Sequence, residues 1–354
     1  MQVNYTVDCL NDHESVSNEG CVNQIATVII IALDLSIMSQ NSNKLTSRQA
    51  NPLFGSIVVP GDKSISHRAL IIGSLAIGTT KIRGLLNGED VMSTKNALVS
   101  LGVDIWKDDN EIWFVKGVGL NGMISPPSPL NLGNSGTGVR LIMGVVAGQK
   151  ITATFFGDKS LSMRPMDRII NPLDKVGAKI ISRDRGLLPV TIEGTRTPSA
   201  ITYVSTVASA QIKSAILFSG LNARGTTKIT EPLASRDHSE SMLCHFGASI
   251  TKQILPDNQC HIELTGEAEL HATEVIVPRD PSSAAFPVVA ALITPGSDIC
   301  LPGIGMNPLR IGLLTTLREM GGEIAFKNER IEGGEPVADL HVRASELRGI
   351  SVPQ

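Results

Sequence analysis

From Gly55 onward, the hydrophobic positions recur in four amphipathic stretches, each of which closes on a glycine and runs into a strand-like sequence. Apolar side chains return every three or four residues, which is the spacing of one helical face. The stretches are STKNALVSLGVDI, RIINPLDKVGAKI, SESMLCHFGASI and GLLTTLREMGGEI. The helical faces of the first two start two residues before the quoted letters, with Val91, Thr94, Leu98 and Leu101 on the first and Met166, Ile169, Leu173 and Val176 on the second.

The closing glycines mark an internal repeat. Glycine readily adopts the left-handed conformation that ends a helix, so we expect that conformation at each of them. A constant period of this kind is the strongest fold signal in the chain. The glycines are Gly102, Gly177, Gly247 and Gly321, at intervals of 75, 70 and 74 residues.

A second set of four segments alternates with the first and is apolar almost all the way round. Such helices are expected to be buried, and each is followed by a glycine turn and a β-rich stretch. Each repeat therefore has the order strand, buried helix, strand, covering helix, strand, strand, which predicts an α/β fold of βαβαββ units. The segments are SHRALIIGSLAIGTTKI, TGVRLIMGVVAGQKITA, AQIKSAILFSGLNARGTTKI and SSAAFPVVAALITPGSDICL.

Residues 1–50 do not follow this pattern, and we interpret them as a non-core extension. The apolar run Ile25–Met38 is about fourteen residues long and contains Asp34, which is too short and too interrupted to span a bilayer. Acidic residues precede it, so it does not resemble a signal peptide. The polar stretch SQNSNKLTSRQ predicts a flexible linker.

Composition narrows the class of protein. The chain has 354 residues, 42% hydrophobic, with a net charge of -3 and no basic stripe, which argues against a nucleic-acid surface. Five cysteines without CxxC spacing predict neither a disulfide framework nor a zinc site and favour the reducing cytoplasm. We interpret His238 and His245 as a coincidence on a helix surface rather than a metal site.

The opening of the first buried helix, PGDKSISHR, predicts an anion site. The first-turn amides of a helix have no partners within it, the macrodipole is positive there, and Lys63 and Arg68 add full charges beside the hydroxyls of Ser64 and Ser66. The alternative is that Asp62 or Ser64 merely caps the helix while the cations are solvated.

Similar openings recur in the later repeats. The second contains a glycine through which a ligand can approach the backbone, with an arginine one turn on, whereas the fourth is most simply a serine-capped helix with a proline start. Together with arginines near the covering helices, these openings predict a pocket for substrates that carry several phosphates or carboxylates. The residues are Asn134, Gly136, Thr137 and Arg140; Ser209, Ala210, Gln211 and Lys213; Asp280 to Ser283; and the two arginines Arg164 and Arg236.

Seven motifs in this order resemble 5-enolpyruvylshikimate-3-phosphate synthases, and within them the bacterial class II branch. The resemblance covers roughly Pro52 to the C-terminus. It implies the enolpyruvyl transferase fold, with two lobes of three repeats each, about four of the six being present here. It also implies transfer of the enolpyruvyl group of phosphoenolpyruvate to the 5-hydroxyl of shikimate 3-phosphate, by addition and elimination. The motifs are PGDKSISHRALIIGSLA, NLGNSGTGVRLIMG, GDKSLSMRPMDRIINPL, LPVTIEG, ASAQIKSAILFSGL, SRDHSE and DPSSAAFPVVAAL.

The resemblance also implies the roles of individual residues. It implies neither a metal nor an organic cofactor, and it implies inhibition by glyphosate at the phosphoenolpyruvate position. We expect a cytoplasmic monomer. The shikimate 3-phosphate contacts are Lys63, Ser64, Arg68, Ser209, Ala210, Gln211, Ser235 and Arg236. The phosphoenolpyruvate contacts are Lys63, Asn134, Gly136, Thr137, Arg164 and Gln211, with Lys63 as the catalytic residue among them.

The sequence departs from the family at its end, RGISVPQ, before the segment that would carry the aspartate base. We therefore expect residues 62–274 to form a complete three-repeat lobe and residues 51–61 with 275–354 an incomplete one. We also expect the buried helix Ser282–Thr294 to expose apolar surface. Turnover by the chain as given should be slow or absent.

Two other functions remain open. The related UDP-N-acetylglucosamine enolpyruvyl transferases share the fold, but their KNA-type N-terminal site and loop cysteine are not found here. A non-catalytic ligand-binding remnant is the other alternative. The acceptor that supports phosphate release distinguishes the shikimate-pathway enzyme from the UDP-N-acetylglucosamine enzyme. Release of any phosphate excludes the non-catalytic remnant.

Overall fold

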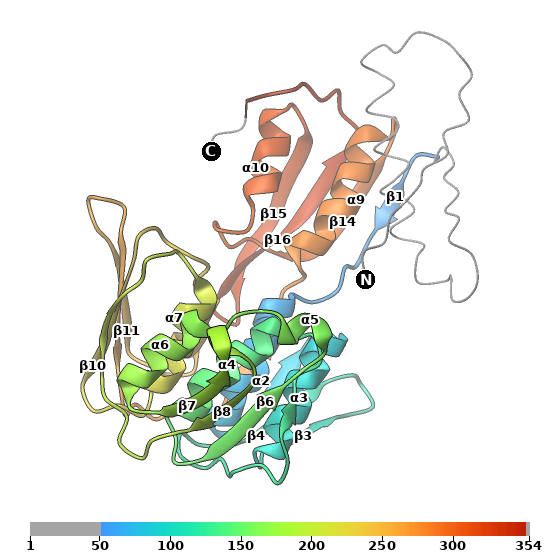
Figure 1. The fold of residues 1–354 in the computed structure, drawn as a ribbon. Helices are drawn as coiled ribbons and strands as arrows, with labels where there is room; N and C mark the ends of the chain where they lie inside the picture. The colour runs from blue at the N-terminus through green and yellow to red at the C-terminus, as the bar shows by residue number, and fades with distance from the viewer. Residues whose placement is uncertain (1–50, 352–354) are drawn as a thin grey trace. The chain divides into compact units, whose positions relative to one another are not determined.

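The computed structural model describes residues 51–351, which divide into two compact units (Figure 1). The larger contains residues 60–278 and 330–336. The smaller unit contains the other described residues, which are 51–59, 279–329 and 337–351. The assignment of these parts to one complete and one incomplete lobe stays a prediction, as does every expectation on residues 1–50, which lie outside the described range.

Four sheets of four strands have the same topology, which confirms the predicted repeat. In each, one edge strand is parallel to its neighbour, and that neighbour is antiparallel to the next strand of the sheet. Three sheets lie in the larger unit. They are β13 (Glu274–Ile276), β2 (Ile77–Arg83), β4 (Trp113–Val118) and β3 (Asp104–Lys107); β5 (Leu130–Asn131), β6 (Thr152–Phe156), β8 (Leu187–Glu193) and β7 (Lys179–Arg183); and β11 (Ile250–Ile254), β12 (Cys260–Thr265), β10 (Thr226–Glu231) and β9 (Thr202–Val204).

Three helices that are apolar nearly all round form the centre of the larger unit, as their sequences predict. They are α2 (Lys63–Leu75), α4 (Gly136–Ala147) and α7 (Ala210–Gly220). The backbones of α4 and α7 touch: a Cβ built on Gly144 would lie 2.4 Å from the carbonyl oxygen of Ala215, and one on Gly148 2.6 Å from that of Ser219. Glycine is therefore required where these two helices pack.

The covering helices close each repeat on its outer side. The predicted apolar faces of the first two are buried, with every side chain at 1% exposure or less. All four closing glycines have the expected left-handed backbone, with φ between 93° and 108°. The helices are α3 (Glu89–Ser100), α6 (Asp167–Val176) and α8 (His238–His245) in the larger unit, which also contains α5 (Lys159–Ser162) and the 3₁₀ turn Asp184–Gly186.

The smaller unit has one sheet and two helices. Its buried helix begins and ends one residue before the predicted range, and Phe286 on it is 48% exposed, so the expected apolar exposure is present. The expected mobility and aggregation stay predictions. The elements are β1 (Phe54–Ser56), β14 (Asp298–Gly305), β16 (Glu335–Arg343) and β15 (Glu323–Glu332), with α9 (Pro281–Ile293) and α10 (Gly312–Glu319).

One expectation about the histidines is wrong. His245 is exposed, but His238 is only 2% exposed, and its Nδ1 lies 2.8 Å from Oε1 of Glu335, at the hairpin tip that belongs to the larger unit. Cys244, Cys260 and Cys300 are free thiols. Within residues 51–351 no helix is long and apolar enough to cross a membrane, and no cluster of side chains has the makeup of a metal site.

Candidate functional site

The N-termini of the three buried helices of the larger unit are tied together by side chains. Nε2 of Gln211, at the start of α7, donates to Oγ1 of Thr137, at the start of α4, at 3.1 Å. Arg68 on α2 donates through its Nη2 to Oγ of Ser214 on α7 at 2.9 Å. Three positive helix ends therefore meet in one region, where the helix dipoles favour an anion.

The opening of α2 combines a cap with a cation. Oδ1 of Asp62 accepts a hydrogen bond from the Ile65 amide at 2.9 Å, so the capping role that the sequence left open is real. Lys63 is half exposed, and its Nζ lies 3.1 Å from Oδ2 of Asp90. Ser66 is fully buried and donates to the Asp62 carbonyl, so of the two hydroxyls in this motif only Ser64 remains accessible.

Arg68 is held entirely by protein groups. It is 2% exposed, and it donates to Oγ of Ser239 at 2.7 Å as well as to Ser214 and to the Ser64 carbonyl. Burial lowers the pKa of Arg68 to about 10, which leaves the side chain charged at neutral pH. Its positive charge therefore lies directly beneath the Ser64 turn.

His67 in the same motif gives a pH-dependent contribution to stability. Burial, with the charge of Arg68, lowers the pKa of His67 from 6.5 to about 3, and its Nδ1 lies 2.8 Å from Oγ1 of Thr94. A depressed pKa in the folded state stabilises the protein above pH 6.5, and this stability is lost as the pH falls toward 3. The unfolding free energy of His67→Asn should therefore fall less than that of the wild type between pH 6.5 and 4, as urea titrations at each pH can measure. Parallel curves would contradict the assignment.

Gly136, the first residue of α4, lies between two arginines. A Cβ built on it would be 2.9 Å from Nη1 of Arg164 and 3.0 Å from Nη1 of Arg140. No salt bridge joins either guanidinium to a carboxylate among the described residues. Burial lowers the pKa of Arg140, and the neighbouring charge of Arg164 lowers it further. Two adjacent cations that form no direct ion pair within the described residues favour binding of an anion at this glycine.

Arg164 is fixed by the loop that precedes α4. It donates to Oδ1 of Asn134 and, at 3.1 Å, to Oγ of Ser160. Nδ2 of Asn134 in turn donates to Oδ2 of Asp158 at 2.7 Å. Asn134 therefore orients the arginine, which is a more specific role than the sequence indicated.

The third opening depends on a buried carboxylate. Oε1 of Glu231 accepts from the backbone amide of Ser209 at 2.9 Å and from Oγ of Ser235 at 2.7 Å. Glu231 therefore holds both serines in place, although they are 26 residues apart in the chain. Ser209 itself caps α7, followed by Ala210 and Gln211 in its first turn.

Lys213 balances this carboxylate and a second one. Its Nζ lies 3.0 Å from Oε2 of Glu231 and 2.8 Å from Oε1 of Glu240, and all three side chains are at most 5% exposed. Sequence reasoning missed this network. The available signal was the alternation along β10, where Glu231 falls on the same buried side as Thr227 and Ile229.

Arg236 is exposed and forms no hydrogen bond or ion pair with any other described residue. Its charge nevertheless contributes to the lowered pKa of Arg68. It is thus a third cation without an ion pair among the described residues, and it lies near the opening of α2. The structure therefore brings together sequence-predicted residues of all three repeats, Arg140 among them.

Comparisons with known proteins agree on one family. The family model of EPSP synthase (3-phosphoshikimate 1-carboxyvinyltransferase) matches residues 47–353. The chain is 55% identical over 315 residues to a 3-phosphoshikimate 1-carboxyvinyltransferase of Parvibaculum lavamentivorans, covering 89% of this chain and 70% of the relative. It is 54% identical over 316 residues to one of Bradyrhizobium diazoefficiens, covering 89% and 67%. The solved EPSP synthase structure from Acinetobacter baumannii matches with a TM-score of 0.79 and 44% identity, over 86% of this chain and 68% of that one.

Proposed function

Because this chain belongs to the EPSP synthase family, we propose that it transfers the enolpyruvyl group of phosphoenolpyruvate to the 5-hydroxyl of shikimate 3-phosphate and releases phosphate. This is a transferase reaction of the shikimate pathway, which leads to chorismate and the aromatic amino acids. The observation that carries the proposal within the site is Gly136, a residue without a side chain, at a helix N-terminus between two guanidiniums.

The shikimate 3-phosphate site is proposed to lie where α2 and α7 begin. The phosphate needs several donors, and this region offers the Lys63 ammonium, the Ser64 hydroxyl and the unpartnered guanidinium of Arg236. Arg68 contributes its charge from below. The proposed contacts are Lys63, Ser64, Arg68, Ser209, Ala210, Gln211, Ser235 and Arg236.

The phosphoenolpyruvate site is proposed to lie at the start of α4. Its phosphate would meet the amide end of the helix beside Arg164, and Arg140, which the sequence already placed one turn into this helix, adds a second charge. Lys63 is proposed to contact both substrates and to stabilise the charge that develops between them. The proposed contacts are Lys63, Asn134, Gly136, Thr137, Arg164 and Gln211.

The test combines binding with turnover. We expect shikimate 3-phosphate to bind on its own in calorimetry, because all eight of its proposed contacts lie in the larger unit. Phosphate release is then measured with phosphoenolpyruvate and either shikimate 3-phosphate or UDP-N-acetylglucosamine as acceptor. Absence of shikimate 3-phosphate binding, or release supported by the nucleotide sugar alone, would overturn the proposal.

We also propose that the protein is a cytoplasmic monomer. Light scattering after size exclusion measures the molar mass and so tests the monomeric state.

Replacing Gly136 with alanine should weaken phosphoenolpyruvate binding, measured with shikimate 3-phosphate present, at least tenfold. The added methyl group would occupy the space between Arg140 and Arg164, whose flexible ends can move aside without unfolding the protein. Binding of shikimate 3-phosphate alone should change less than twofold, and inhibition by glyphosate should weaken. The control is Gly312→Ala, where a Cβ meets nothing within 4 Å. Equal effects of the two substitutions would remove Gly136 from the site.

A further inference from the structure

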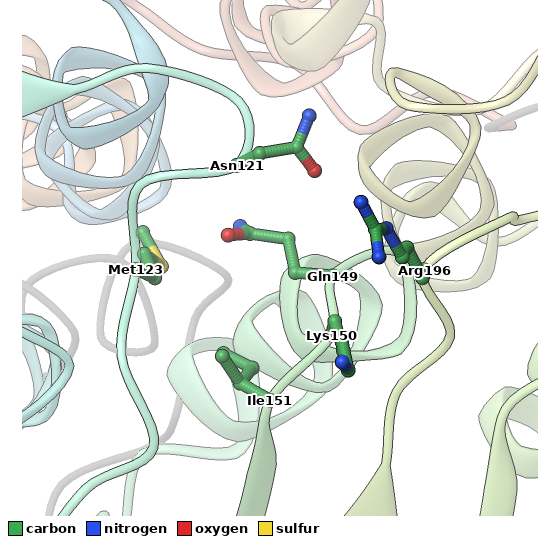
Figure 2. A pocket seen from close by; sticks show the side chains of 6 residues that line it. All are labelled: Asn121, Met123, Gln149, Lys150, Ile151 and Arg196. Carbon is green, nitrogen blue, oxygen red and sulfur yellow. The ribbon is translucent and has the colours of Figure 1, made fainter.

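A cavity of about 370 Å³ lies at the other end of α4 from Gly136. Its walls come from two repeats: the loop after β4, the turn after α4 and the segment after β8 (Figure 2). Its size suits a small molecule. The helix has 12 residues, so the cavity is separated from the substrate region by roughly 18 Å at about 1.5 Å per residue. The lining residues are Asn121, Met123, Gln149, Lys150, Ile151 and Arg196.

The cavity is electropositive. Lys150 and Arg196 are exposed, and neither forms a hydrogen bond or ion pair with another described residue. Among the residues that the structure describes, no acidic side chain lines the cavity. Two unpaired cations around one cavity attract an anion, and none of the residues in the described range 51–351 that line it supplies one.

The buried part of the wall is only partly satisfied. Gln149 is 2% exposed, and its Oε1 has no hydrogen-bond partner. Its carboxamide extends between Met123 and Arg196 in Figure 2. Buried amide oxygens without partners are rare in folded proteins. Met123 and Ile151, at 4% and 7% exposure, supply apolar contacts beside it.

A helix C-terminus would ordinarily disfavour an anion, because its free carbonyls are partly negative. Here the last carbonyls of α4 are already engaged. The Ala147 oxygen accepts from the Thr195 amide at 3.1 Å, and the Gly148 oxygen accepts from Nδ2 of Asn222 at 2.9 Å. The repulsion is thereby reduced, and the charges of Lys150 and Arg196 dominate the cavity.

We propose that this cavity binds a small organic anion, separately from the substrate site. Its carboxylate or phosphate group pairs with Lys150 and Arg196, and its apolar body packs on Met123 and Ile151. The carboxamide of Gln149 exchanges hydrogen bonds with a polar substituent. The ligand class is therefore a small carboxylic acid or phosphate monoester with an apolar ring or chain.

The experiment uses the full chain with ¹³C-labelled methionine and isoleucine methyl groups. Benzoate and phenyl phosphate are the probes, and benzamide is the uncharged control with the same ring. We expect either anion to shift the methyl signals of Met123 and Ile151, with benzamide binding at least tenfold more weakly. The anion that binds more tightly identifies the head group. Saturating shikimate 3-phosphate should leave the shifts unchanged.

The combined variant Lys150→Ala, Arg196→Ala should bind the better probe at least tenfold more weakly. Both side chains are exposed, so the fold is not at risk. The matched control is Lys228→Ala, a surface lysine of the same unit that pairs with Glu263, and it should bind as the wild type does. Equal binding of benzamide, an unaffected double variant, displacement by shikimate 3-phosphate, or shifts at Met163 without shifts at Met123 and Ile151 would each overturn the proposal.

Discussion

Replacing Lys213 with methionine is expected to lower the free energy of unfolding of the larger unit by about 3–5 kcal/mol. The substitution removes the only cation that lies within 4 Å of the carboxylates of Glu231 and Glu240 among the described residues, and both would remain buried. Urea unfolding can be followed by tryptophan fluorescence, because Trp106 and Trp113 both belong to this unit.

The control is Lys228→Met, which breaks the exposed pair with Glu263 at 2.8 Å. It should cost about 0.2–1 kcal/mol, the range typical of surface pairs. If both variants were equally stable, the buried network would contribute no more than a surface contact.

The stability that the buried Lys213 network contributes also has a defined pH range. Burial alone would lower the pKa of Lys213, but Glu240 and Glu231 raise it above 10.5, so the stability is present below that pH and is lost as the pH rises through the raised pKa.

Arg236→Ala should weaken binding of shikimate 3-phosphate by roughly 10- to 150-fold. A hydrogen bond to a charged group contributes about 1.5–3 kcal/mol, and each 1.4 kcal/mol corresponds to a factor of ten in affinity. Since Arg236 has no partner among the described residues, its loss should leave the stability of the fold unchanged. Arg236→Lys retains the charge but not the two-pronged geometry, so its affinity should be intermediate.

Calorimetry with shikimate 3-phosphate measures this effect, and Arg224→Ala is the matched control. Arg224 is 91% exposed in the same unit and pairs with Glu267 at 3.3 Å. Its replacement should leave the affinity within twofold of the wild type. An equal loss in both variants would mean that Arg236 acts only through general electrostatic attraction.

The fold was predictable because its signals are local. The helical faces that end at Leu101 and Val176 depend on a spacing of three or four residues, and the closing glycines depend on a single backbone angle. The period of these signals then gave the number of repeats. The same holds for the helix openings, since caps and helix dipoles involve neighbouring residues.

The parts of the structure that the sequence did not predict depend on contacts between distant residues. Glu335 pairs with His238, 97 residues away, and Ser239 accepts a hydrogen bond from Arg68, 171 residues away. Nothing near His238 in the sequence indicates such a partner, so it was placed on the surface. The contact of Arg164 with this opening is similar. Arg140 lies one turn from Gly136 in the sequence, whereas only the fold brings Arg164 to the same glycine.

The backbone contact at Gly144 links the helix interior to the substrate end. Because a methyl group there would lie 2.4 Å from the Ala215 oxygen, any side chain must push α4 and α7 apart. The close approach of α4 and α7 also keeps their N-termini near enough for the hydrogen bond from Gln211 to Thr137. A genetic selection for inhibitor tolerance that also demands a working enzyme should therefore recover substitutions at Gly136 but none at Gly144.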